Sequence, residues 1–197
     1  MWSEEQIKGY LKEKLKKNRY EHSLSVQDTA EKLAKFYHVD IKKASTAGLV
    51  HDCAKYMSDD EILFMAHENQ VPIDEVSGLN PQLLHGNIAA VIAKNIMGIY
   101  DEEILSAVAC HTTGKKDMSL LEKVVYIADY IEPLRNFPGV EILREEAFIN
   151  LDTALLDAFN NTIKVVINRG QLLHVNTISG RNYLVFKKAH SKAYSKK

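Results

Sequence analysis

The sequence predicts an all-α protein with a single domain, and three observations favour this fold class. Helix start signals recur along the chain, and helix stop signals follow them. Strand-like alternation of apolar and polar residues is scarce. Three of the start signals are capping boxes, in which a serine is followed three residues later by glutamine or glutamate. They are Ser3 with Gln6, Ser58 with Glu61, and Ser119 with Glu122. We therefore expect a helical bundle.

Other signals bound the remaining helices. Asn80-Pro81 places a capping residue before a proline at the first helical position, and an acidic run from Asp101 stands where a helix N-terminus favours negative charge. Stop signals stand at Gly98, Gly114, Pro133 and Gly170. The expected helices cover residues 3–17, 19–37, 41–55, 59–69, 81–97, 102–112, 120–132, 140–147, 152–169 and 177–188.

Length and charge limit the classes of function. A chain of 197 residues with 46% hydrophobic content suits one domain over residues 1–197, with a solvated basic tail from about residue 187. Lys and Arg total 25 against 26 for Asp and Glu, so there is no global field to attract nucleic acid or an anionic membrane. We expect no specific nucleic-acid partner, and an anionic substrate must be bound locally. The best candidate for a long functional loop is residues 135–139.

The cysteines and the hydropathy pattern bear on location. Cys53 and Cys110 form no CxxC motif, and a chain of this size needs no disulfide framework, so we expect two free thiols in a reducing compartment. No signal peptide is visible, and no stretch approaches the roughly 18 apolar residues of a membrane span. We expect a cytoplasmic protein without a membrane partner. The sequence leaves open whether it is a monomer or a homodimer.

Four of the eight histidines fall on the apolar faces of expected helices. They are His22, His51, His85 and His111. A single inward histidine is usually a hydrogen-bonded core residue, and this interpretation is the alternative for each of them. Four in one bundle weaken that alternative, because desolvating several imidazoles is costly unless something gathers them. A metal ion is the commonest agent that does so.

Two aspartates strengthen the prediction of a metal site. Asp129 interrupts an apolar run and needs a partner, for which a buried ion pair with Arg19 or Arg135 is the structural alternative. Asp52 follows His51, and neighbours on a helix diverge by about 100°. Both can therefore serve one centre only if it lies between them, or if the carboxylate bridges two ions.

At these residues the chain resembles a known family. His22, His51-Asp52 and Asp129 follow the H…HD…D pattern of the HD-domain phosphohydrolase superfamily. The matching motifs are Arg19-Tyr20-Glu21-His22, Gly48-Leu49-Val50-His51-Asp52-Cys53-Ala54-Lys55, Leu84-His85-Gly86, His111-Thr112-Thr113-Gly114 and Ile127-Ala128-Asp129-Tyr130-Ile131-Glu132-Pro133. They are similar to those of bacterial HD-domain symmetrical bis(5'-nucleosyl)-tetraphosphatases, which cleave diadenosine tetraphosphate into two ADP. The resemblance covers about residues 10–185, with no departure at a motif position.

The resemblance implies a site in which each residue has a role. The expected metal ligands are His22, His51, Asp52 and Asp129. The residues expected to face substrate are His22, His85, His111, Thr112, Asp129 and Arg135, and those expected to act in catalysis are Asp52, His85 and His111. The resemblance implies one iron ion, with a second ion as an option at His85 and His111. Imidazole and carboxylate ligands also suit manganese or another divalent metal, and affinity order alone does not choose among them.

Two further candidates for substrate binding come with alternatives. Lys55 lies one turn beyond the HD dipeptide and can stabilise developing charge, although a solvated lysine is the ordinary alternative. His174, Asn176 and Thr177 combine hydrogen-bonding groups with apolar neighbours, as a base or ribose pocket requires. A helix cap at Thr177 explains part of that pattern equally well.

These residues lead to one functional hypothesis and two alternatives. The leading hypothesis is symmetrical hydrolysis of dinucleoside tetraphosphates by metal-activated water, with ADP as the product. The alternatives are a nucleotide phosphatase or phosphodiesterase of the same superfamily, and a non-catalytic nucleotide-binding regulatory protein with a structural metal. His85, His111 and Arg135 exceed the needs of one ion, and this surplus favours an enzyme with a nucleotide substrate.

Overall fold

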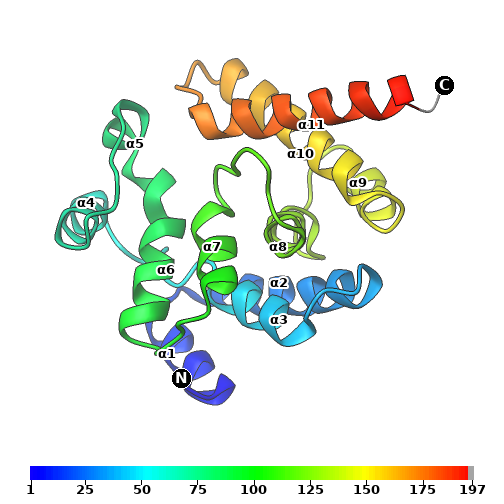
Figure 1. Ribbon diagram of the computed structural model, residues 1–197. Coiled ribbons are helices and arrows are strands. Elements are labelled where there is room, and N and C mark those ends of the chain that lie inside the picture. The colour runs from blue at the N-terminus through cyan, green and yellow to red at the C-terminus, as the bar shows by residue number, and fades with distance from the viewer. Residues whose placement is uncertain (195–197) are drawn as a thin grey trace.

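The computed structural model describes residues 1–194, with side chains through residue 190. Over these residues the protein is all-α, with eleven α-helices, one short 3₁₀ helix and no strand (Figure 1). The α-helices are α1 (Glu4–Lys14), α2 (Lys17–Phe36), α3 (Ile41–Val50), α4 (Asp59–Glu68), α5 (Glu75–Leu79), α6 (His85–Asn95), α7 (Glu102–Cys110), α8 (Leu120–Ile131), α9 (Val140–Ala147), α10 (Leu151–Asn168) and α11 (Val175–Tyr194), and the 3₁₀ helix η1 is Pro81–Leu84. None of the helices within the described residues is long and apolar enough to cross a membrane.

The helix starts confirm the capping boxes. The serines before α1, α4 and α8 each accept a hydrogen bond from the backbone amide three residues later. The Gln or Glu side chain at that later position accepts a hydrogen bond from the backbone amide of the serine. Asp74 and Ser77 form a fourth box that begins α5, a five-residue helix too short for its periodicity to show. The prediction that Asn80 caps the next helix is wrong, because its side chain makes no capping hydrogen bond to η1.

Several helix boundaries differ from those predicted. The helix expected over residues 41–55 ends at Val50, and residues 51–56 form successive turns. The helix expected over residues 81–97 divides into η1 and α6. The last helix continues through Tyr194, so residues 187–194 do not form a separate tail. Lys187 helps to hold this extension by an ion pair with Asp152 of α10, with nitrogen and oxygen 2.8 Å apart. Residues 195–197 lie outside the described residues.

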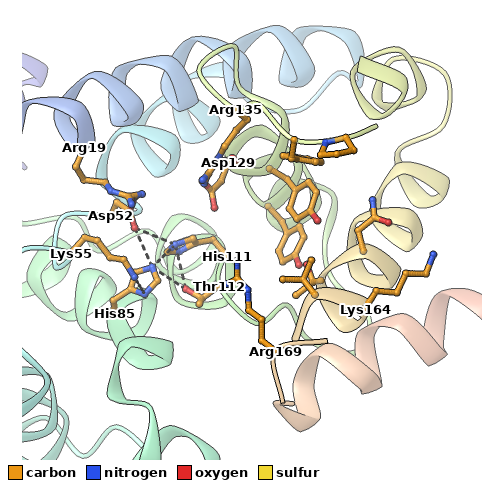
Figure 2. A pocket seen from close by; sticks show the side chains of 17 residues that line it. Arg19, Asp52, Lys55, His85, His111, Thr112, Asp129, Arg135, Lys164 and Arg169 are labelled. Atoms are coloured by element: carbon orange, nitrogen blue, oxygen red, sulfur yellow. Dashed lines mark hydrogen bonds and ion pairs between the residues drawn. The ribbon is translucent and has the colours of Figure 1, made fainter. Parts of the chain in front are cut away.

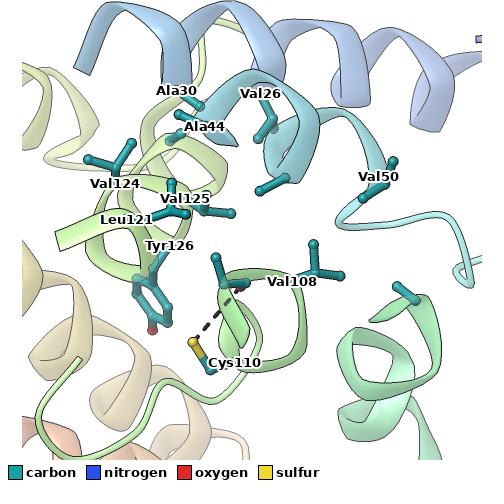
Figure 3. Packing of buried hydrophobic residues seen from close by; sticks show 14 of the residues in the cluster. Val26, Ala30, Ala44, Val50, Val108, Cys110, Leu121, Val124, Val125 and Tyr126 are labelled. Carbon is teal, nitrogen blue, oxygen red and sulfur yellow. Dashed lines mark hydrogen bonds between the residues drawn. The ribbon is translucent and has the colours of Figure 1, made fainter. Parts of the chain in front are cut away.

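The core lies where α2, α3, α7 and α8 meet, and small or branched side chains fill it (Figure 3). Val26, Ala44 and Val108 are fully buried there. Gly48 lets α2 and α3 approach closely, since a Cβ added to it would lie 3.1 Å from the Cα of Gln27. This close packing brings His22 of α2 beside the end of α3, where His51 stands.

Helices α10 and α11 pack on each other, and α10 also packs on α8, so they lie to one side of the core helices (Figure 1). Phe159 of α10 is fully buried. A Cβ at Gly114, whose φ is +65°, would lie 2.5 Å from the Phe159 ring, and one at Gly180 would lie 2.9 Å from it. Both glycines therefore leave room for the ring that fixes α10 against the loop after α7. The result is a wall that faces the helices carrying the histidines.

Candidate active site

Four buried histidines present the same ring nitrogen to a common centre. The Nδ1 atoms of His51 and His111 donate to the carbonyls of Gly48 and Val108, both at 2.7 Å. Each of these histidines directly follows the last residue of a helix, where carbonyls are free to accept such bonds. His85 Nδ1 makes the equivalent bond to the preceding 3₁₀ helix. Because a carbonyl only accepts, each Nδ1 carries the proton and each Nε2 lone pair is free to bind a cation.

His22 is held in the same way by a carboxylate. Its Nδ1 donates to Glu132 Oε1 at 2.9 Å, and Glu132 is 1% exposed. Glu132 also accepts a hydrogen bond from the amide of Leu134 at 2.6 Å. Although burial raises the pKa of Glu132, hydrogen bonds from Ser25, His22 and that amide lower it below its ordinary value. The carboxylate orients the imidazole and makes it a stronger ligand.

The first group of donor atoms comes from α2, the end of α3 and α8. His22 Nε2 lies 3.3 Å from His51 Nε2 and 3.0 Å from Asp129 Oδ1, and His51 Nε2 lies 3.7 Å from the same oxygen. Asp52 Oδ2 is 3.7 Å from His22 Nε2 and 3.5 Å from His51 Nε2. Ligands about 2.0–2.2 Å from one ion are roughly 3–3.5 Å from each other, so these atoms fit a metal. His22, His51 and Asp129 form one of two groups able to hold an ion in the described residues.

The other oxygen of Asp52 faces a second pair of histidines. Asp52 Oδ1 lies 3.1 Å from His85 Nε2 and 3.7 Å from His111 Nε2, and the two nitrogens are 3.0 Å apart. Thr112 Oγ1 lies 3.2 Å from His85 Nε2 (Figure 2). Two unprotonated nitrogens at this distance repel each other unless a cation or proton lies between them. The geometry therefore suits an aspartate that bridges two ion positions.

The charges of the site favour cation binding. Asp52 is buried, and although burial raises its pKa, interactions with His51, His111 and His85 hold the pKa well below its usual range. The pKa of Asp129 is lowered too, by His22, His51 and Arg135 against the effect of burial. Burial lowers the pKa of His111 to about 4. The carboxylates are thus charged at neutral pH, and His111 is neutral and available as a ligand.

Each aspartate also has an arginine partner. Arg19 donates to Asp52 Oδ2 at 2.6 Å, and Arg135 donates to the carboxylate of Asp129 and, at 2.8 Å, to its carbonyl. The ion pair between Asp129 and Arg135, which the sequence analysis gave as the structural alternative to a metal site, is therefore present. Asp129 also faces the histidines, so the ion pair does not exclude a role in metal binding. The loop that carries Arg135 is fastened by Arg144, whose guanidinium donates to the carbonyls of Ile131, Glu132 and Arg135 at 2.8–2.9 Å.

A cavity of about 740 Å³ opens beside these groups (Figure 2). The predicted residues that line it are Asp52, Lys55, His85, His111, Thr112, Asp129 and Arg135. Phe137 and Pro138 of the candidate functional loop, residues 135–139, also line it. Sequence reasoning assigned Arg19 no role beyond an ion pair, and it missed Tyr126, Tyr130, Asn161, Thr162, Lys164, Val165 and Arg169. Lys55 is half-buried and faces the cavity with its Nζ 3.2 Å from His85 Nδ1, and burial lowers its pKa, which favours a role in the site over that of an ordinary surface lysine.

The residues expected to form a base pocket lie away from this cavity. His174 and Asn176 do not line the cavity, and His174 Nε2 lies 2.9 Å from Asp74 Oδ2. The hydroxyl of Thr177 is buried and donates to the carbonyl of Thr113 at 2.9 Å. His174 Nδ1 accepts the amide hydrogen of Asn176, so His174 supplies the cap that the pattern suggested for Thr177. The hydrogen-bonding groups of this segment are used in joining α11 to its neighbours.

Comparison with known proteins shows the family to which the chain is similar. A model of the HD domain family matches residues 19–134, which include all four histidines and both aspartates. The symmetrical bis(5'-nucleosyl)-tetraphosphatases of Halalkalibacterium halodurans and Bacillus subtilis are 37% and 36% identical, over 89% and 92% of this chain and 93% and 97% of their own lengths. A crystal structure from Clostridium acetobutylicum, described as a predicted HD superfamily hydrolase involved in NAD metabolism, is 49% identical, with a TM-score of 0.93. It covers 95% of this chain and 99% of its own.

Proposed function

The chain belongs to the HD domain family, and from this membership we propose that it hydrolyses dinucleoside tetraphosphates symmetrically, diadenosine tetraphosphate giving two ADP. The observation that carries the proposal is Asp52, whose two oxygens face two pairs of histidines at one end of a large cavity. The relatives named as symmetrical tetraphosphatases support the choice of substrate. Two buried free cysteines suit a reducing compartment, and we place the enzyme in the cytoplasm.

We assign the metal ligands from the donor set. His22, His51, Asp52 and Asp129 would hold one ion, which we propose to be iron, and manganese fits the same donors. His85 and His111 would share Asp52 with a second ion. A bound ion supplies Lewis acidity toward phosphoryl oxygen and lowers the pKa of water to near neutrality. Both effects are useful for attack on a phosphoanhydride, which is poorly reactive toward neutral water.

The chain's own cations would hold the phosphates. Arg135 and Arg19 each border a ligand carboxylate, and their remaining N–H groups can donate to phosphoryl oxygens in the cavity. Lys55 adds a charge beside His85, and the Thr112 hydroxyl can donate to the same phosphate. During hydrolysis, the oxygen of water bonds to an inner phosphorus and the bond from that phosphorus to the central bridging oxygen breaks. Charge develops on that oxygen, and cations placed near it stabilise the transition state.

Product analysis tests the proposal directly. Metal content is measured by elemental analysis, and early products from diadenosine tetraphosphate are separated by chromatography. Two ADP per substrate are expected. ATP with AMP would refute symmetrical cleavage, whereas no turnover after iron or manganese is restored would favour a non-catalytic regulator.

Two variants test the assigned roles. His51→Ala should remove bound metal and activity together, because it deletes a buried ligand. Arg135→Ala should keep its metal but lose roughly 1.5–3 kcal/mol of transition-state stabilisation in kcat/KM, the range for a charge-assisted contact to phosphate. A His51→Ala protein with full metal, or an Arg135→Ala enzyme with unchanged kinetics, would remove that residue from the proposal.

A further inference from the structure

Two cations line the part of the cavity formed by α10: Lys164 within the helix and Arg169, which directly follows its last residue. Both side chains are exposed, and neither makes an ion pair or hydrogen bond with the residues that the structure describes. Arg19 and Arg135, which line the same cavity, are each paired with an aspartate. The charges of Lys164 and Arg169 are therefore available to an anion that enters the cavity.

The end of α10 sets the position of Arg169. The helix stops at Asn168, and Gly170 adopts a left-handed conformation with φ of +63°. The amide of Arg169 donates to the carbonyl of Val165, and the amide of Gln171 donates to that of Val166, both at 3.1 Å. Figure 2 shows the Arg169 side chain extending from this helix end toward His111 and Thr112, with Lys164 farther along the wall. Arg169 thus approaches the metal end of the cavity from the side opposite Arg135.

Between the two ends, the cavity offers groups suited to a nucleoside. Tyr130 and Phe137 are half-buried, with ring centroids 5.3 Å apart at an interplanar angle of 77°, and Val165 continues this apolar surface. The Asn161 side-chain amide makes no hydrogen bond within the described residues and can donate and accept. Apolar walls with a few convergent polar groups are typical of small-molecule sites. This half of the cavity therefore combines apolar, amide and cationic groups.

We propose that Arg169 and Lys164 form an outer anion subsite, which binds the nucleoside diphosphate half that departs from the reacting phosphorus. The inference rests on the proposed function and deepens it. In the reaction, a bond forms from water oxygen to one inner phosphorus, and the bridging oxygen leaves with the electron pair of the broken P–O bond. The protons of water pass to solvent, and the two ADP products carry the charge. Arg169 donates to the departing diphosphate with a planar fork that matches phosphate oxygens, and Lys164 neutralises its outer charge.

One structural explanation needs no ligand. Cations near a helix C-terminus interact favourably with the helix dipole, and both residues lie in the last two turns of α10 or just after it. Lys35 occupies the same kind of position in the last turn of α2, is exposed, and does not line the cavity. Lys12 of α1 is exposed as well and also lies away from the cavity. The pair Lys12→Gln and Lys35→Gln therefore provides a matched loss of two charges.

The experiment compares the double variant Lys164→Met/Arg169→Met with the wild type and with Lys12→Gln/Lys35→Gln. Metal-loaded proteins are assayed for kcat/KM on diadenosine tetraphosphate, and calorimetry measures the Kd of inorganic tetraphosphate and of orthophosphate. We expect kcat/KM and tetraphosphate affinity to fall at least about tenfold in the subsite variant, because charge-assisted bonds to phosphate are lost. Orthophosphate affinity should stay within about twofold, because the metal end is intact, and Arg169→Lys should retain part of the affinity.

Three results would overturn the inference. The first is that the subsite variant keeps tetraphosphate affinity within twofold of the wild type. The second is that it loses orthophosphate affinity as much as tetraphosphate affinity. The third is that the matched charge variant shows the same loss of tetraphosphate affinity. Failure of the proposed function gives a different result, since the wild type would then not cleave diadenosine tetraphosphate. The comparison of tetraphosphate with orthophosphate binding would still decide whether the subsite exists.

Discussion

The substitution Gly86→Ala tests whether close packing of α6 on α7 builds the second histidine pair. Gly86 is buried and follows His85 at the start of α6. A Cβ there would lie 2.9 Å from the carbonyl oxygens of Val108 and Ala109, and 3.1 Å from His111 Nδ1. The two oxygens belong to the backbone of α7, and the ring is held by its hydrogen bond to Val108. None of these atoms can move alone, so α6 must shift away from α7.

The size of the effect follows from these contacts. Overpacking of this kind costs about 1–3 kcal/mol, and the better helix propensity of alanine returns at most about 1 kcal/mol. A net loss of about 1–2 kcal/mol corresponds to a Tm lower by about 2–8 °C in a protein of this length. The shift also separates His85 Nε2 from His111 Nε2, which are 3.0 Å apart. A displacement of about 1 Å in a catalytic group can cost about 100-fold in rate.

Differential scanning calorimetry measures Tm, and kcat/KM on diadenosine tetraphosphate shows whether the geometry of the active site has changed. Gly9→Ala is the matched control, because Gly9 lies inside α1 and a Cβ there would meet nothing within 4 Å. That variant should be more stable by about 0.5–1 kcal/mol, with unchanged activity. A Gly86→Ala protein with wild-type Tm and wild-type kcat/KM would show that the α6–α7 contact does not determine the histidine geometry.

Three further predictions concern groups outside the ligand set. Glu132→Gln should weaken metal binding about 10–100-fold in a chelator competition, because the ligand imidazole loses its carboxylate partner; unchanged metal affinity would contradict this role. Arg144→Met should loosen the loop that carries Arg135 and raise KM for the tetraphosphate with metal content kept, and an unchanged KM would show that the loop is held without it. Burial raises the pKa of Cys110 to about 12 and that of Cys53 further above its ordinary value, so both thiols should react with iodoacetamide only after unfolding; rapid labelling of the native protein would refute this.

Much of the fold followed from local signals, and the errors share one cause. The capping boxes at Ser3, Ser58 and Ser119 were correct because a cap depends on residues only three positions apart. The expected helix over residues 41–55 was too long, because nothing local marks its end at Val50. The apolar pattern continues into the turns there, where burial of Cys53 and Ala54 in the core maintains it.

The site residues divide in the same way. His22, His51 and Asp129 could be chosen from sequence because a histidine or carboxylate on an apolar face is costly and therefore conspicuous. Arg169 and Lys164 could not, because a basic residue near a helix end is ordinary. Glu132 left one signal, an acidic residue at the end of an apolar helix before Pro133, but its partner His22 lies 110 positions away.

The sequence by itself determined the all-α class, the helix starts and the residue types able to bind a metal, since each depends on spacing within a few turns. Only the tertiary structure decided that Asp52 faces both pairs of histidines, because its two oxygens meet groups from α2, α6 and the ends of α3 and α7. It also placed the side chains of α10, and not the segment at His174, along the cavity. The physical reason is that a cavity belongs to surfaces brought together by packing, and the pattern of any one helix records only that a face is buried, not what lies opposite it.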